Sequence, residues 1–107
     1  MKVRQYQIFL VNLDPTKGSE IRKTRPALII SPDEMNASLR TVVIAPLTTT
    51  SRHYPTRVKI EQPTIHGFVA LDQVRTIDKQ RLIKELGSLS RKEIQAVKTV
   101  LRQTYVD

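Results

Sequence analysis

Residues 18–30 read GSEIRKTRPALII, a charged loop that runs directly into an apolar strand. The loop holds one carboxylate, at Glu20, and three cations, at Arg22, Lys23 and Arg25. Charged groups on a loop that is held by a rigid strand are typical of catalytic or phosphate-binding sites. Arg25 stands where loop becomes strand, and its planar fork of donors suits phosphate oxygens. The alternative is a solvated charged loop without a function.

The composition limits the class of protein. The chain has 107 residues, which predicts a single domain over residues 1–107, and its formal net charge is +8. This excess favours RNA or DNA as partner over an anionic membrane, and no apolar run approaches the ~20 residues that span a bilayer. The absence of cysteine excludes disulfides and suits the reducing cytoplasm. His53 and His66 lie in separate loops, so we expect no metal and no cofactor.

The first two thirds of the chain predict strands. Short runs of aromatic and β-branched residues, bounded by proline, glycine and aspartate, span residues 6–13, 26–31, 41–47, 56–60 and 67–74. Proline cannot donate to a ladder of hydrogen bonds, so Pro46 marks an edge, a bulge or a strand end. Residues 33–39 favour a short helical turn.

The last third predicts helices. Asp78 is a cap for a short helix through Leu86, with Gly87 as the stop. Ser90 and Glu93 form a capping box. It opens a helix with an apolar stripe at Ile94, Val97, Val100, Leu101 and Tyr105. Strands followed by helix indicate an α+β fold: a small SH3-like antiparallel β-barrel of about five main strands with a C-terminal helix.

Three segments can form a basic cleft if their strands are adjacent. They are the loop that ends at Arg25, residues 48–53, and residues 71–75. Together they offer guanidiniums, hydroxyls and carboxylates. The hydroxyls are also ordinary turn formers, and Asp72 can equally be an N-cap or an ion-pair partner of Arg25 or Arg75. These residues indicate a nucleic-acid cleft and leave the reaction open.

Cations near this cleft can neutralise phosphates, and aromatic side chains can stack on unpaired bases. For His53 and Tyr54, stacking and a plain surface position are both open, whereas Phe68 is expected to pack in the core. The candidate RNA-binding residues are Lys17, Ser19, Arg22, Lys23, Thr49, Arg52, His53, Tyr54 and Arg75.

Four sequence blocks carry a resemblance to a known family. They read LDPTKGSE at 13–20, TRPALIISP at 24–32, APLTT at 45–49 and DQVRTID at 72–78. In this order and spacing, the chain resembles the MazF/PemK family of bacterial toxin endoribonucleases, the toxin half of toxin–antitoxin pairs. The C-terminal helix matches only in pattern.

The resemblance implies a homodimer of SH3-like barrels that cleaves single-stranded RNA at short motifs without a metal. Attack of a 2′-hydroxyl on its own 3′-phosphate then leaves a 2′,3′-cyclic phosphate and a 5′-hydroxyl. Arg25 and Thr48 match the family's catalytic positions, and Glu20 matches a loop residue implicated in activity or substrate placement. An acidic, partly disordered antitoxin is the implied partner, and operator DNA is bound only through the complex with it.

One departure from the family concerns acid–base chemistry. Kid-type members are assigned a catalytic histidine in the first loop and an arginine two residues before the aspartate, where this chain has Ser19 and Ala70. The acceptor of the 2′-hydroxyl proton therefore stays open among Glu20, Asp72 and Arg25. Two other functions are alternatives: a toxin of the same fold that poisons DNA gyrase, and a noncatalytic barrel that binds nucleic acid.

Overall fold

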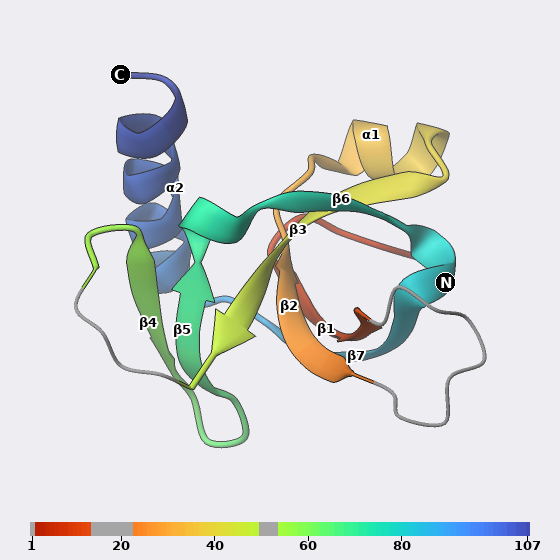
Figure 1. Ribbon diagram of the computed structural model, residues 1–107, viewed down its shortest axis with the longest axis horizontal. Coiled ribbons are helices and arrows are strands. Elements are labelled where there is room, and N and C mark those ends of the chain that lie inside the picture. Colours follow the sequence, from red (N-terminus) through yellow and green to blue (C-terminus); the bar gives the residue numbers. More distant parts are fainter. Residues whose placement is uncertain (1, 14–22, 50–53) are drawn as a thin grey trace.

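The computed structural model describes residues 2–13, 23–49 and 54–107 (Figure 1). In chain order the elements are β1 (Gln7–Asn12), β2 (Thr24–Ile29), α1 (Asp33–Ser38), β3 (Thr41–Thr48), β4 (Arg57–Glu61), β5 (His66–Ala70), the 3₁₀ turn η1 (Leu71–Gln73), β6 (Arg75–Asp78), the 3₁₀ turn η2 (Lys79–Arg81), β7 (Leu82–Ser88) and α2 (Arg91–Tyr105).

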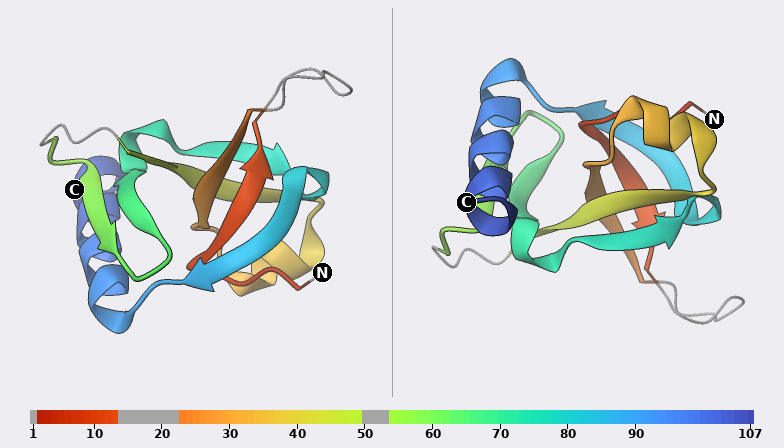
Figure 2. Two further views of the ribbon diagram at one scale, coloured as in Figure 1. Left: turned by 90° about the horizontal axis from the view of Figure 1, so that it is seen from below. Right: turned by 90° about the horizontal axis from the view of Figure 1, so that it is seen from above.

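The strands form one antiparallel sheet in the order β4-β5-β3-β2-β1-β7, and β6 pairs with β3. The sheet is strongly curled, so that β1, β2, β3, β6 and β7 enclose a barrel while the β4–β5 hairpin extends to one side (Figures 1 and 2). Helix α2 lies against that hairpin. This arrangement confirms the predicted α+β class with a curled antiparallel sheet and a C-terminal helix, and it adds β6 and β7 to the five strands expected.

Two hydrophobic clusters lie on opposite faces of the sheet. The first, called here the helix-side core, contains Leu28, Leu47, Val58 and Val69 and is completed by Val97 of α2. The second, the barrel core, fills the curl and consists of Val3, Phe9, Val11, Ala27, Ile29, Val42, Ile44, Ile77 and Leu82. Because side chains alternate along a strand, each residue of β2 and β3 can be assigned to one of these two faces.

The helix expected from Asp78 to Leu86 is wrong. Asp78 does act as a cap, since its Oδ1 accepts a hydrogen bond from Gln80 N at 2.8 Å, but the capped segment is only the short turn η2. The chain then continues as β7, which pairs with β1 from Leu82 to Ser88. Ile8, Phe9 and Val11 are buried, so the backbone of β1 is buried as well. Its N–H and C=O groups therefore need hydrogen-bond partners on both edges of the strand. That long-range pairing overrides a weak local helix preference.

Several strand ends also differ from the prediction; β2, for example, runs from Thr24 to Ile29 rather than over residues 26–31. The fifth strand stops at Ala70, and Leu71 begins η1 rather than continuing to Val74. The third strand runs past Pro46 to Thr48. On one edge, β3 pairs with β6 as far as Ile44 and with β5 only from Leu47. Pro46 lies in the gap between these two partner strands, where its missing N–H removes no hydrogen bond to either of them.

Helix α2 begins and packs as the sequence predicts. The Ser90 hydroxyl accepts from Glu93 N at 3.2 Å, and the Glu93 carboxylate accepts from Ser90 N at 2.9 Å. In its apolar stripe, Val97 is fully buried in the helix-side core and Ile94, Val100 and Leu101 pack against that core, whereas Tyr105 is 56% exposed. At its end, the Tyr105 hydroxyl donates to the carbonyl of Leu71 and ties α2 to η1. No helix in the described ranges is long and apolar enough to cross a membrane.

Candidate active site

Arg25 and Thr48 lie on the same face of neighbouring strands. The last paired residues of β2 and β3 are Ala27 and Pro46, and each of the two candidates lies two residues further along its own strand. Ala27 belongs to the barrel core, so alternation assigns Arg25 and Thr48 to the barrel face, beyond the end of the packed interior. From there the strands diverge (Figure 1), and Arg25 pairs with Val11 on β1.

The same face continues across the hairpin. Thr48 is paired with Phe68 on β5, and Phe68 in turn with Lys59 on β4. Residues directly opposite one another in a sheet share a face, so this row points away from the helix-side core. On β6, Arg75 pairs with Ile44 of the barrel core and is exposed. We call the surface formed by Arg25, Thr48, Phe68, Lys59 and Arg75 the basic face.

A hydrogen-bonded cluster borders the basic face. The Asp72 carboxylate accepts from Arg57 Nε at 2.9 Å, from Arg57 Nη2 at 3.3 Å and from the Thr56 hydroxyl at 2.9 Å. Arg57 also lies over the ring of Tyr54, 5.3 Å from its centroid, within the range of a cation–π contact. The side chain of Arg57 is only 11% exposed, so Asp72 holds it in place and Arg57 supports Tyr54.

These contacts determine the protonation of Asp72. The hydrogen bonds from Arg57, with a smaller one from Thr56, hold the pKa of the Asp72 carboxyl below its usual range, and burial opposes them only in part. A carboxylate with a lowered pKa and three donors already bound is a weak proton acceptor at neutral pH.

Asp72→Asn is expected to destabilise the fold at neutral pH and to have no effect in acid. The carboxyl has its lowered pKa only in the folded state, so its contribution is fully present above the usual value of about 3.9 and is lost as the pH falls through the lowered folded value. Thermal melts of both proteins from pH 7 downward measure this convergence.

Glu61→Gln is the matched control, because the ion pair of Glu61 with Lys59 is long, at 3.8 Å, and both side chains are mostly exposed. It should change the melting temperature little at any pH. A loss from Asp72→Asn that stayed constant down to low pH would contradict the role of the Asp72 charge.

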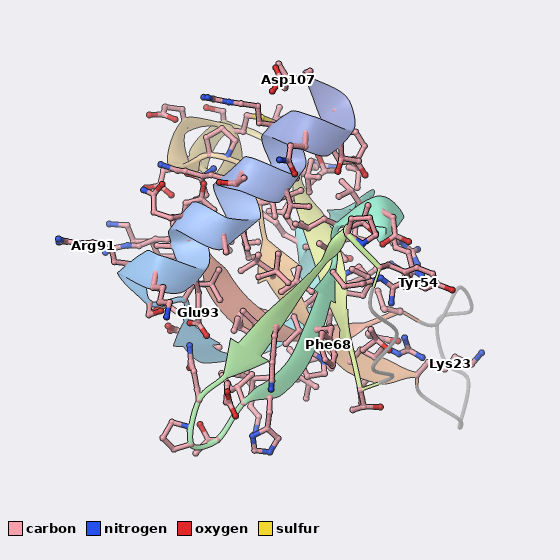
Figure 3. The ribbon with its side chains drawn as sticks, turned by 90° about the vertical axis from the view of Figure 1, so that its left-hand side faces the viewer. Lys23, Tyr54, Phe68, Arg91, Glu93 and Asp107 are labelled. Atoms are coloured by element: carbon pink, nitrogen blue, oxygen red, sulfur yellow. The ribbon has the colours of Figure 1, made fainter. Side chains whose placement is uncertain are left out.

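The other predicted site residues divide into two groups. Lys23, Thr49, Tyr54 and Arg75 are exposed on the described part of the chain. In Figure 3, Lys23, Tyr54 and Phe68 lie on one side of the molecule, away from Arg91 at the start of α2. The remaining candidates lie outside the described residues: Lys17, Ser19, Glu20, Arg22, Arg52 and His53.

No carboxylate in the described ranges forms an ion pair with Arg25. Within the described ranges, the ion pairs are Arg57–Asp72 and Lys59–Glu61. A hollow of about 230 Å³ is lined by Pro26, Thr64, Ile65, His66 and Leu86, and Arg25 is not part of its lining. Across the same three ranges, no group of three or more His, Asp or Glu side chains is arranged to hold a metal ion.

Phe68 is the residue of this site that sequence reasoning placed wrongly. It is only partly buried and packs against neither core, although Val69 beside it is fully buried. The alternation of Val69 with Phe68 and of Val58 with Lys59 was visible in the sequence. Which of the two faces is covered depends on where α2 packs.

Comparisons with known proteins show the family of this chain. The family described as PemK-like, MazF-like toxin of type II toxin–antitoxin systems matches residues 4–105. A curated relative, Endoribonuclease MazF of Staphylococcus saprophyticus, is 33% identical over 105 residues, which cover 92% of this chain and 88% of the relative. The chain therefore belongs to the PemK-like, MazF-like toxin family.

Solved structures show the same fold. An endoribonuclease in complex with its cognate antitoxin, from a mycobacterial species, superposes with a TM-score of 0.83 at 26% identity, covering 94% of this chain and 92% of that one. A MazE–MazF complex from Deinococcus radiodurans gives a TM-score of 0.84 over 96% of this chain and 95% of its own, at 24% identity, and supports the fold alone.

Proposed function

We propose that this toxin is an endoribonuclease that cuts single-stranded RNA at short sequence motifs without a metal. Membership of the toxin family supports the reaction class, as does the endoribonuclease activity named for the relative from Staphylococcus saprophyticus. The observation that carries the proposal is the shared face of Arg25 and Thr48 at the diverging ends of β2 and β3. A phosphate between these ends meets a guanidinium from one strand and a hydroxyl from the other.

The proposed step is a transphosphorylation. The 2′-oxygen forms a bond to the adjacent phosphorus and gives up its proton, the bond from phosphorus to the 5′-oxygen breaks, and that oxygen leaves with a proton as a 5′-hydroxyl. Negative charge builds up on the nonbridging oxygens in the transition state. Arg25 stabilises that charge more than it stabilises the ground state, an effect worth about 3–4 kcal/mol for one well-placed donor.

Thr48 orients the scissile phosphate through its hydroxyl. Arginine stays protonated in proteins, so Arg25 acts by its charge and as a hydrogen-bond donor to the phosphate oxygens, and the leaving 5′-oxygen takes its proton from solvent. Asp72 is held by Arg57 and Thr56, which favours a positioning role in which it fixes Arg57 and thereby Tyr54. Glu20 then becomes the preferred acceptor of the 2′-hydroxyl proton.

Exposed groups around the basic face bind the rest of the RNA. Lys23 and Arg75 neutralise phosphates, Thr49 donates to one, and Tyr54 stacks on a base. The candidates at Lys17, Ser19, Arg22, Arg52 and His53 extend the same surface in this proposal. Unpaired bases are needed for such stacking, which explains a preference for single strands.

The partners follow from charge and family. A chain of net charge +8 attracts an acidic antitoxin segment, and we propose that such a segment covers the basic face. The related mycobacterial endoribonuclease is bound to its cognate antitoxin. We further propose that the toxin works as a homodimer in the cytoplasm and reaches operator DNA only through the antitoxin complex.

The test is to incubate a long single-stranded RNA with the purified toxin in EDTA and to map the new ends. Discrete cuts with 5′-hydroxyl and 2′,3′-cyclic phosphate ends are the expected result. Intact RNA together with trapping of gyrase on DNA would favour the gyrase poison instead. Salt-sensitive binding without any cut would favour a noncatalytic nucleic-acid-binding barrel.

A further inference from the structure

Phe68 is an aromatic side chain without a place in either core. Its neighbours Val69 and Ala70 are fully buried, yet Phe68 is only partly buried and packs against neither the helix-side core nor the barrel core. Figure 3 shows it with Lys23 and Tyr54 on the side of the hairpin away from α2. A phenyl ring left on a charged face does little for folding, which points to a ligand that covers it.

The neighbours of Phe68 place it next to the proposed reaction. It is directly opposite Thr48 on one side and Lys59 on the other. Such cross-strand pairs have Cβ atoms about 4.5–5.5 Å apart. Gly67 allows the backbones of β5 and β3 to lie close together here, because a Cβ atom at this position would lie 2.9 Å from the Thr48 carbonyl oxygen. The ring is therefore held beside the hydroxyl that contacts the scissile phosphate in the proposed function.

Lys59 supplies the charge that matches this ring. Its side chain is 63% exposed, and its contact with Glu61 is long and open to solvent. An ammonium group at that position can bind a backbone phosphate while the ring stacks on a base. A hydroxyl, a phenyl ring and an ammonium group in one row thus match a phosphate, its neighbouring base and the next phosphate.

We propose that Phe68 is a stacking platform for the base next to the scissile phosphate, with Lys59 binding the following phosphate. The inference rests on the proposed RNA cleavage. Stacking is made equally in the ground state and the transition state, so it mainly lowers KM. Every base has an aromatic face, so the platform positions the strand and leaves the choice of motif to other contacts.

Fluorescence gives a direct test, because the chain contains no tryptophan. The Phe68→Trp variant is titrated with a short, randomised single-stranded 2′-O-methyl RNA, which cannot be cut. We expect its fluorescence to be quenched as the RNA binds. Ile83→Trp is the control: Ile83 is exposed on β7, outside the basic face, and its fluorescence should stay unchanged. Anisotropy of labelled RNA confirms that both variants bind.

Kinetics give the second measurement. Phe68→Leu should raise KM for a cleavable RNA about 10- to 100-fold with kcat nearly unchanged, and Phe68→Trp should restore KM. Cleavage by the native protein with no quenching of bound Phe68→Trp, or an unchanged KM in Phe68→Leu, would overturn the platform alone. Quenching without cleavage by the native protein would support the platform and overturn the proposed reaction. No RNA binding by the native protein would overturn both.

Discussion

Arg25→Ala is expected to slow RNA cleavage by about 10²- to 10³-fold while the protein stays folded. Arg25 is exposed at the start of β2, and none of the described carboxylates is ion-paired with it, so its loss leaves the packing intact. The rate falls because the charge of the pentavalent phosphorus loses its main stabiliser. Single-turnover cleavage under saturating protein, with circular dichroism of the same samples, measures both parts of this expectation.

Arg91→Ala is the matched control for charge. Arg91 is exposed at the start of α2, on the other side of the molecule from Lys23 and Tyr54 (Figure 3), and the variant loses the same unit charge. It should cut RNA at nearly the native rate. If Arg25→Ala and Arg91→Ala lowered the rate equally, Arg25 would be one of many cations and not the stabiliser of the transition state.

Gly67→Ala is expected to lower cleavage per folded molecule by about 10- to 100-fold. Gly67 has φ +152°, which side chains rarely allow, and the added Cβ atom would lie 2.9 Å from the backbone oxygen of Thr48. The end of β3 must shift to relieve that contact, and a shift of about 1 Å at a positioning group can cost about 10²-fold in rate. The strain should also reduce the free energy of unfolding by about 1–3 kcal/mol.

Gly87→Ala is the control that separates the effect of backbone strain from the effect of displacing Thr48. Gly87 has a similar φ, +155°, but its added Cβ atom would meet Ile65 Cδ1 at 3.1 Å, the end of a side chain that can move. Urea unfolding should therefore show that both variants lose stability, while kcat falls only in Gly67→Ala. Equal kcat values for the two variants would mean that the placement of Thr48 does not limit the reaction.

The candidate site was partly visible in the sequence. Arg25 and Thr48 stand in blocks that match a family, so their importance follows from the order of residues alone. That they share a face follows only from the register of Ala27 with Pro46, which no local pattern contains. The role of Asp72 changed most, since Asp72 lies in η1 and its partner Arg57, 15 residues away, begins β4. Long-range pairs of this kind depend on topology and not on local preference.

The sequence alone determined the elements whose stabilising contacts lie close together along the chain. The capping box of Ser90 and Glu93 starts α2 because both partners lie within one helical turn, and the strands before it were visible as short β-branched runs. Tertiary structure decided the rest. Residues 82–88 became a strand because β1 needed a partner on its second edge. Phe68 and Lys59 became part of the basic face because α2 covers the opposite side of their hairpin. Alternation divides a strand into two faces, but only packing decides which face meets solvent.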